Sequence, residues 1–502
     1  MLTSVALIIL ICIGIIYLIS NYRKRLRFVQ AGNALPGPKT LPIIGNAYYC
    51  LQKNVDEFLN LVQLFSNTYP SPFRVWMGNK LLISISEPDQ IKIVLQNSSC
   101  LNKSIIYEFL RTWLRMGILT APAHIWVQHR KMLASSFNTN ILRAFCDIFV
   151  KHTSVFMEKI EYMVDTEVDL SHHVTKYTMN MTYETLLNIN EGSQLKKNEL
   201  YVNAVKRLKE IFIYRLRNIF LYPDIIFNLT SLSREQQKHV NFLCSVAEEV
   251  IQQKENARDN LVENKNQSAM FSRKAFLDIL MEASDEDKKF TRKEIIDEIN
   301  TMSFGATDTT AITLNFMMFM LANFPEVQQK VYEELLKIYG TQDPKFASVK
   351  FEDLQHMNYM ERVIKETLRL FSIVPVVGRQ LDTDLQIGDY ILPKGAEIAI
   401  LILAVHRNEK YWPKALTFDP DRFLPGNMAN IYPYSYMPFS NGPRNCIGMR
   451  YAMTSMKVFI ATLLRTYILK VDKKVKIEEI ELKMDMMLSP MNPLKVRIEK
   501  RK

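Results

Sequence analysis

The sequence has few cysteines, no internal repeat and no low-complexity linker. Its six cysteines are scattered without paired spacing: Cys12, Cys50, Cys100, Cys146, Cys244 and Cys446. Such spacing does not match the framework of a disulfide-rich secreted protein, so it favours a reducing compartment. The 502 residues, 48% of them hydrophobic, are enough for a large core. Length alone would allow about three domains.

Negative charge is the scarcer sign. The chain has 63 lysines and arginines against 52 aspartates and glutamates, which gives a formal net charge of +11. A basic surface could meet nucleic acid, anionic lipid or an acidic protein, or it could simply be solvated without a partner. Composition does not separate these possibilities.

Charge is absent from residues 2–20, LTSVALIILICIGIIYLIS, and Arg23, Lys24, Arg25 and Arg27 follow. About 20 apolar residues span a bilayer, so this run is just long enough to cross one. A cleaved signal peptide would carry charge before its apolar stretch and a small-residue cleavage site after it. Neither is present, so a membrane anchor is the better interpretation. The basic flank then places the following chain in the cytosol.

A proline-rich segment separates this run from the rest of the chain. Residues 35–46, LPGPKTLPIIGN, hold three prolines and two glycines, which excludes a helix and predicts a stiff extended connector. We therefore expect a transmembrane anchor at 1–20, a basic stop-transfer and proline-rich hinge at 21–46, and the globular part of the protein at 47–502.

The last cysteine, Cys446, stands in the segment FSNGPRNCIG, residues 439–448. An apolar run with helical spacing, 447–467, follows at once, so Cys446 lies where a loop enters a helix. The positive end of a helix and its free N–H groups favour a thiolate over a thiol. The flanking glycines let the backbone approach a flat partner, and Arg444 could pair with an anion on that partner. A thiolate-ligated haem requires this arrangement.

The stretch EINTMSFGATDTT, residues 298–310, places polar residues in the middle of an apolar helical run. Asp308, Thr309 and Thr310 compete with helical backbone hydrogen bonds, and Gly305 costs ~1 kcal/mol relative to alanine. Several such penalties in one segment indicate a functional site, since apolar flanks argue against a solvent-facing patch. An acid beside an alcohol can relay protons to a bound oxygen species, and a locally opened turn would leave room for it.

Two further residue pairs are weak signals by themselves. Glu366 and Arg369 form an E-x-x-R pair, which is a common ion pair of helices, and the later segment PDRF supplies Arg422. Trp126 and Arg130 lie one helical turn apart in WVQHR, and both can donate hydrogen bonds to an anion.

Helical periodicity dominates the chain. The clearest predicted helices are residues 145–164, 199–219, 235–256, 276–283 and 293–324. The predicted strands are shorter: 73–77, 81–85, 387–392, 398–403 and 494–498. The sequence thus predicts a mainly α-helical fold with a small β-rich region.

These segments, in this order behind an anchor and a hinge, resemble the microsomal cytochrome P-450 family over essentially the whole chain. The resemblance implies the cytochrome P-450 fold, with haem b between the two motif helices and one haem-thiolate catalytic domain at 47–502. By this resemblance Cys446 is the ligand of the haem iron, and Asp308 and Thr309 are the oxygen-activating pair. Glu366, Arg369 and Arg422 match the family's structural ion-pair triad. The residues expected to hold the haem are Trp126, Arg130, Arg379, Phe439, Arg444 and Cys446.

Residues 298–310 also resemble the signature of the clan that contains fatty-acid ω-hydroxylases and many insect enzymes. Glu298, Thr301, Phe304, Asp308, Thr309 and Thr310 match this signature. Gly305 departs from it, because many relatives carry a glutamate there that forms an ester with a haem methyl group. Ala306 replaces a glycine and Thr307 a histidine. The resemblance therefore implies haem b that is bound non-covalently, and these departures weaken the signature's indication of a fatty-acid substrate.

The activity implied is insertion of one oxygen atom from O2 into a lipophilic substrate, such as a fatty acid, a hormone-like lipid or a xenobiotic. Electrons would come from NADPH-cytochrome P-450 reductase, with cytochrome b5 as a second candidate donor. The implied location is the endoplasmic reticulum membrane, with the catalytic domain in the cytosol and no nucleic-acid partner. The segments expected to contact substrate are 105–118, 221–232, 373–377 and 484–488.

Two rival interpretations remain open at this point. A haem-thiolate isomerase or dehydratase would need no reductase, and a haem sensor would not be a catalyst. Neither has an evident use for Asp308 and Thr309.

Overall fold

The computed structural model describes residues 22–51, 57–189, 195–263, 276–287, 290–344 and 346–501. The anchor expected at 1–20 lies outside these residues. Within the described ranges, no helix combines the length and the apolar character that a bilayer crossing requires.

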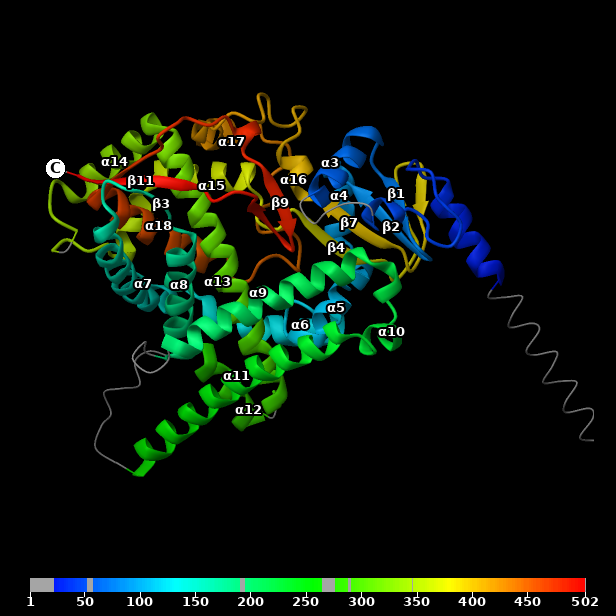
Figure 1. The fold of residues 1–502 in the computed structure, drawn as a ribbon, viewed down its shortest axis with the longest axis horizontal. Helices are drawn as coiled ribbons and strands as arrows, with labels where there is room; N and C mark the ends of the chain where they lie inside the picture. Colours follow the sequence, from blue (N-terminus) through cyan, green and yellow to red (C-terminus); the bar gives the residue numbers. More distant parts are fainter. Residues whose placement is uncertain are drawn as a thin grey trace, which may run out of the picture.

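The described part of the chain is mainly helical (Figure 1). Its α-helices are α2 (Tyr48–Leu51), α3 (Phe58–Thr68), α4 (Pro88–Gln96), α5 (Glu108–Leu114), α6 (Ala123–Leu133), α7 (Thr139–Ile160), α8 (Ser171–Thr182), α9 (Leu195–Arg217), α10 (Asp224–Asn228), α11 (Ser231–Glu263), α12 (Phe276–Asp287), α13 (Arg292–Asn323), α14 (Pro325–Tyr339), α15 (Asn358–Leu370), α16 (Ile402–His406), α17 (Pro425–Met428) and α18 (Met449–Thr466).

Short strands form four small sheets. The strands are β1 (Phe73–Met77), β2 (Lys80–Ile85), β3 (Glu167–Asp169), β4 (Val376–Gln380), β5 (Leu385–Ile387), β6 (Tyr390–Leu392), β7 (Glu397–Leu401), β8 (Tyr467–Lys470), β9 (Leu482–Asp485), β10 (Met487–Pro490) and β11 (Lys495–Lys500). The sheet that borders the site has the order β1-β2-β7-β4, in which β2 and β7 are parallel and the other pairs antiparallel. Figure 1 shows β1 and β2, from the start of the chain, beside β7 and β4 from its later part.

Helix α13 is the centre of the helical part. Its N-terminus carries a capping box, in which the Thr291 side chain accepts from Glu294 N and the Glu294 side chain accepts from Thr291 N. Buried residues occur on every side of the helix, and α8, α11, α12 and α15 pack around it. A helix enclosed in this way can present internal residues to a cavity while its backbone stays hydrogen-bonded. It ends just before Pro325, which starts α14 and could not continue α13.

The proline-rich segment lies against the sheet. Residues 22–33 form a helix, and the chain after them is free of helix up to α2, as its prolines require. Arg74 N of β1 donates to Pro36 O at 2.8 Å, and Asn46 N donates to Trp76 O at 2.6 Å. These bonds join the segment to the edge strand of the sheet.

Candidate active site

An apolar cavity of about 480 Å³ lies between α13, the four-stranded sheet and the loop before α18. Most of its walls are aliphatic or aromatic side chains, including Leu110, Phe304, Val376 and Met487. Such a cavity suits a lipophilic molecule or a large planar group.

Cys446 stands in the loop that closes one side of this cavity. Its side chain is exposed to the cavity, and its N–H donates to Phe439 O at 2.9 Å. Gly442 has φ +73°, and a Cβ there would lie 2.3 Å from Leu95 O, so only glycine fits this turn. Burial raises the pKa of the Cys446 thiol, while the Gly448 N–H and the charge of Arg130 lower it. Helix α18 begins three residues later, close to the predicted start.

Arg444 and Arg130 anchor this loop to neighbouring elements. Arg444 donates to Leu101 O and Ala121 O, both at 2.7 Å, and its guanidinium lies 5.0 Å from the Trp126 ring. Arg130, on α6, donates to Asn445 O at 3.0 Å and to Asn445 Oδ1 at 2.6 Å. Trp126, Arg130, Phe439, Arg444 and Cys446 all line the cavity, so five of the six residues expected to hold the cofactor are brought together.

Arg379, the sixth expected residue, lies behind the cavity wall. It is on β4, is 2% exposed, and donates to Gly378 O at 2.9 Å. Burial, followed by repulsion from Arg379, lowers the pKa of Arg444 to about 9. Lys103 lines the cavity beside them, and burial together with Arg379 and Arg444 holds its pKa well below the usual range. Among the described residues, no carboxylate pairs with these three cations, so an anionic group in the cavity would stabilise all of them.

Sequence reasoning missed Lys103. It stands in the segment LNKSII, and a single lysine before an apolar stretch has no spacing that marks it as a ligand-binding residue. Its closeness to Arg379 and Arg444 arises only because the segment before α5 folds against β4, where the space above Gly378 is filled by Ser104.

Thr309 and Asp308 of α13 face different surroundings. Thr309 lines the cavity, and its Oγ1 donates to Gly305 O at 2.6 Å. The Asp308 carboxylate is instead paired with Lys209 Nζ of α9 at 2.5 Å. Residues Arg292–Asn323 form one continuous α-helix, so the locally opened turn expected near Thr309 is not seen. The Thr309 hydroxyl donates a hydrogen bond to the Gly305 carbonyl, and the helix continues through this turn without a break.

Gly305 also lines the cavity, one turn before Thr309. A Cβ built on Gly305 would meet nothing within 4 Å. The position therefore has room for a side chain, and its glycine is not required by packing. Thr307 is buried, and its hydroxyl has no hydrogen-bond partner among the described residues.

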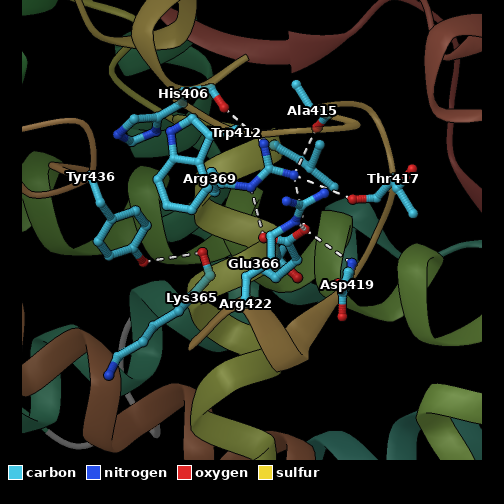
Figure 2. Close-up of polar contacts among 12 residues, drawn as sticks. Lys365, Glu366, Arg369, His406, Trp412, Ala415, Thr417, Asp419, Arg422 and Tyr436 are labelled. Atoms are coloured by element: carbon cyan, nitrogen blue, oxygen red, sulfur yellow. Dashed lines mark hydrogen bonds and ion pairs between the residues drawn. The ribbon is translucent and has the colours of Figure 1, made fainter. Parts of the chain in front are cut away.

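The E-x-x-R pair does not line the cavity but belongs to a buried network of polar contacts (Figure 2). Arg369 Nε donates to Glu366 Oε2 at 2.7 Å, and both side chains are 0% exposed. Arg422 Nε lies 3.4 Å from Glu366 Oε1, which completes the expected triad. Arg369 also donates to the carbonyls of His406 and Ala415, both at 2.7 Å. These bonds hold the segment before the Cys446 loop onto α15, so the triad has a structural role.

Three of the four segments expected to contact substrate contribute strongly to the cavity: 105–118, 373–377 and 484–488. The segment 221–232 contributes Tyr222 alone. Sequence reasoning missed other parts of the wall, which include residues of α3, β1, β2 and β7 and the end of α9. These additional residues include Phe58, Leu61, Phe73, Val75, Phe212 and Leu216.

A family model described as cytochrome P450 matches residues 35–498 of this chain. The chain belongs to the cytochrome P450 family. Similar proteins include cytochrome P450 4c21 of Blattella germanica, 32% identical over 99% of this chain and 98% of the relative. Cytochrome P450 4c3 of Drosophila melanogaster is 34% identical over 97% and 93%, and cytochrome P450 4V2 of Rattus norvegicus is 31% identical over 92% and 89%.

These matches confirm the resemblance to the clan of ω-hydroxylases and insect enzymes, and the mainly helical P450 fold. The protein is a cytochrome P450 monooxygenase that uses haem b and O2. The residues present fit this cofactor, because the Cys446 thiol opens into the cavity, Lys103 and Arg444 line it without a carboxylate partner among the described residues, and the two carboxylates of haem b could neutralise such cations. When bound, haem b supplies reductive activation of O2, and a thiolate ligand favours cleavage of the O–O bond.

Proposed function

We propose that this P450 hydroxylates a lipophilic small molecule, with electrons from NADPH-cytochrome P450 reductase, at the cytosolic face of the endoplasmic reticulum membrane. One observation carries the proposal. Cys446 and Thr309, from different elements, open onto the same apolar cavity, beside cations that have no carboxylate partner in the described part of the chain. An isomerase or a sensor would have no need for the Thr309 hydroxyl at this place.

Cys446 is proposed as the ligand of the haem iron, and the cations around it as the group that holds the haem carboxylates. The resemblance implies this role for Trp126, Arg130, Arg379 and Arg444, with Phe439 as a further haem-binding residue, and we add Lys103, which lines the cavity. Arg130 has a second effect, since its charge lowers the pKa of the Cys446 thiol and so favours the thiolate form.

Thr309 and Asp308 of α13 are proposed to deliver protons to the cavity. The Thr309 hydroxyl donates to Gly305 O, so its oxygen remains able to accept a hydrogen bond from the cavity. Asp308 is the preceding residue, and its carboxylate is paired with Lys209 of α9 at 2.5 Å. An acid next to a hydroxyl that lines the cavity is the arrangement that a proton relay requires.

The haem is proposed to be held without a covalent bond. Gly305 has no side chain that could form an ester, and the neighbours that line the cavity, Phe304 and Ala306, carry no carboxylate. Without a tether or the bulk of a glutamate, control over which substrate carbon is presented is expected to be looser than in the ω-hydroxylases.

The remaining walls support an apolar substrate of the fatty-acid, hormone-like lipid or xenobiotic class. Its access to the cavity is bounded by the β1–β2 hairpin and the end of α9, since Met77 and Leu216 both line it and Gly78 lies close to Ile219. Exclusion of water by these walls would favour the reaction of a C–H bond over release of reduced oxygen.

An apolar surface supports the membrane location. Phe220, Ile225 and Leu229 of the loop between α9 and α11 are 57%, 81% and 82% exposed, and Ile43 is 93% exposed. Ile43 and Ile219 both lie within 4 Å of a Cβ built on Gly78, so the two segments are neighbours. Several large apolar side chains exposed on neighbouring segments suit an interface with lipid.

Exposed basic side chains near the Cys446 loop support a flavoprotein reductase as the partner. Lys131 and Arg450 are both exposed. Both lie close to the Cys446 loop, because Lys131 follows Arg130 on α6 and Arg450 is in the first turn of α18. A basic surface at this side would attract an acidic electron donor, for which the flavoprotein reductase is the first candidate and cytochrome b5 the second.

The experiment is turnover by the purified protein with NADPH, O2 and the reductase against a panel of fatty acids, steroids, terpenoids and xenobiotics. We expect a hydroxylated product of at least one lipophilic class that forms only when reductase and NADPH are both present. Product formation without the reductase would contradict the proposal and favour an isomerase or dehydratase.

A further inference from the structure

His406 is a buried histidine that the haem chemistry leaves without a role. It is the last residue of α16 and is 0% exposed. The sequence gives no reason to single it out, since it belongs to no motif recognised there. In the structure every polar atom of its side chain has a partner, and these partners belong to two different parts of the fold.

The two ring nitrogens of His406 connect Ser372, just after α15, to Met437, at the start of the Cys446 loop. His406 Nε2 accepts a hydrogen bond from Met437 N at 2.8 Å. Because a backbone N–H can only donate, Nε2 carries no proton and the proton is on Nδ1. Nδ1 then donates to Ser372 Oγ at 2.6 Å, and the Ser372 hydroxyl donates to Leu368 O at 3.3 Å. Burial, aided by repulsion from Arg369, lowers the pKa of His406 to about 3, so the ring stays neutral.

The ring is also fixed in orientation. It stacks on Tyr436 with ring centres 5.5 Å apart, and the Tyr436 hydroxyl donates to Lys365 O at 3.0 Å. The His406 carbonyl accepts from Arg369 Nη1 at 2.7 Å. Figure 2 shows His406 and Tyr436 on the same side of Arg369. The imidazole is therefore held by α15 through its ring, its backbone and its stacking partner.

Met437 lies at the start of the loop that carries Cys446 and is connected to it by backbone hydrogen bonds. Its carbonyl accepts from Ser440 N at 2.9 Å, and Phe439 O accepts from Cys446 N at 2.9 Å. A displacement of the Met437 peptide would thus pass through two backbone hydrogen bonds to Cys446. Met437 is 2% exposed, so its N–H would have no water to replace the imidazole.

We propose that His406 is a positioning residue for the thiolate: its imidazole fixes the Met437 amide against α15 and thereby sets where the loop presents Cys446. The proposal rests on the proposed role of Cys446 as the iron ligand. His406 touches neither the cavity nor the haem, so its effect is on how firmly thiolate coordination is kept.

The test uses the full-length, haem-loaded protein and three variants. His406→Phe keeps a flat ring against Tyr436 but removes the acceptor, whereas His406→Gln keeps a side-chain oxygen that can accept from Met437 N. His356→Phe is the matched control, because His356 is an exposed histidine away from the loop. The measurement is the long-wavelength Soret band of the reduced carbon monoxide complex, which reports thiolate coordination, followed over time together with haem content and thermal midpoint.

We expect His406→Phe to retain haem but to lose the thiolate-type band roughly tenfold faster than the wild type, since a buried donor is left unpaired. His406→Gln should recover most of the lifetime, and His356→Phe should match the wild type. Equal lifetimes for His406→Phe and the wild type would overturn the inference. So would a His406→Gln variant as impaired as His406→Phe, because ring packing alone would then explain the effect.

Should His406→Phe fail to fold, Ser372→Ala provides the second test. It removes the acceptor that keeps the proton on Nδ1, so we expect a lifetime between those of the wild type and a variant without the Met437 bond. If no folded His406→Phe is obtained, an unchanged lifetime in Ser372→Ala would reject the inference. A wild type that never shows the thiolate-type band would instead reject the proposed role of Cys446.

Discussion

At the scale of single residues, Asp308 and Thr309 are neighbours in the sequence but have different surroundings in the structure. Thr309 faces the cavity while Asp308 is paired with Lys209 of another helix. The motif brings both residues to one turn of α13, but it does not contain Lys209, which is 99 positions away in the sequence. Lys103 and His406 escaped sequence reasoning for the same reason, because their partners come together only through tertiary structure.

Replacement of Thr309 tests the proton role. We expect Thr309→Ala to lower product formed per NADPH several-fold and to raise peroxide release, since the hydroxyl that faces the cavity is lost. Thr313→Ala is the control: Thr313 makes the same kind of bond, to Thr309 O at 2.7 Å, one turn further along α13. Equal coupling in Thr309→Ala and the wild type would place the proton relay elsewhere.

Gly305 allows a test of haem attachment. Denaturing the wild-type protein in acidified organic solvent should release all of its haem into the solvent, because Gly305 and its cavity-lining neighbours Phe304 and Ala306 carry no carboxylate and Asp308 is paired with Lys209. We expect Gly305→Glu to fold, since a Cβ there has no neighbour within 4 Å, and to retain part of its haem with the polypeptide after turnover. Wild-type haem that stayed with the chain would show a covalent link that the proposal excludes.

At the scale of elements, the long helices were predictable and their ends were not. The predicted helix 293–324 corresponds to α13, and 276–283 falls within α12, because apolar spacing of 3.6 residues is strong there. The strand predicted at 73–77 coincides with β1. The helix predicted at 235–256 is longer in the structure, where α11 runs from Ser231 to Glu263, since a solvated helix needs little apolar periodicity.

The loop between α9 and α11 has an internal anchor that no sequence pattern indicated. Arg215 is 2% exposed, donates to Leu221 O at 2.9 Å and to Tyr222 O at 3.0 Å, and lies 4.2 Å from the Phe227 ring. It also pairs with the exposed carboxylate of Asp224 at 2.5 Å. One buried guanidinium therefore holds the apolar loop that carries Tyr222 into the cavity wall.

We expect Arg215→Leu to loosen this loop, because three hydrogen bonds are lost and two carbonyls are left unpaired. Amide hydrogen exchange in residues 218–230 should accelerate by roughly tenfold or more. Asp224→Asn removes only the exposed partner, so exchange should change by less than about threefold. If both variants exchange as slowly as the wild type, the loop is held by its apolar contacts instead.

At the scale of the whole molecule, a single family match covers residues 35–498, and the one haem domain expected at 47–502 stays a prediction. Length alone had allowed about three domains. The sequence could not place the sheet, because β1 and β2 are separated from β7 and β4 by nearly the whole helical part, and their pairing depends on contacts between distant segments. For the same reason, sequence reasoning did not identify α3 and α9 as parts of the cavity wall.

Deletion of residues 2–20 tests the anchor. We expect most of the truncated protein to leave the membrane fraction, with weak residual attachment through the exposed residues Ile43, Ile225 and Leu229. In intact microsomes the catalytic domain of the full-length chain should be digested by added protease. Protection of the domain would contradict the orientation drawn from Arg23, Lys24, Arg25 and Arg27.

The central claim is that Cys446 supplies a thiolate ligand to haem iron, and the reduced carbon monoxide spectrum of Cys446→His tests it most directly. The wild type should show the long-wavelength Soret band that thiolate donation produces. In the variant, imidazole can still bind iron, so haem can remain while that band disappears. Cys100→Ala, a change at a buried cysteine outside the cavity wall, serves as the control and should keep the band. A Cys446→His protein with the wild-type spectrum would contradict the assignment.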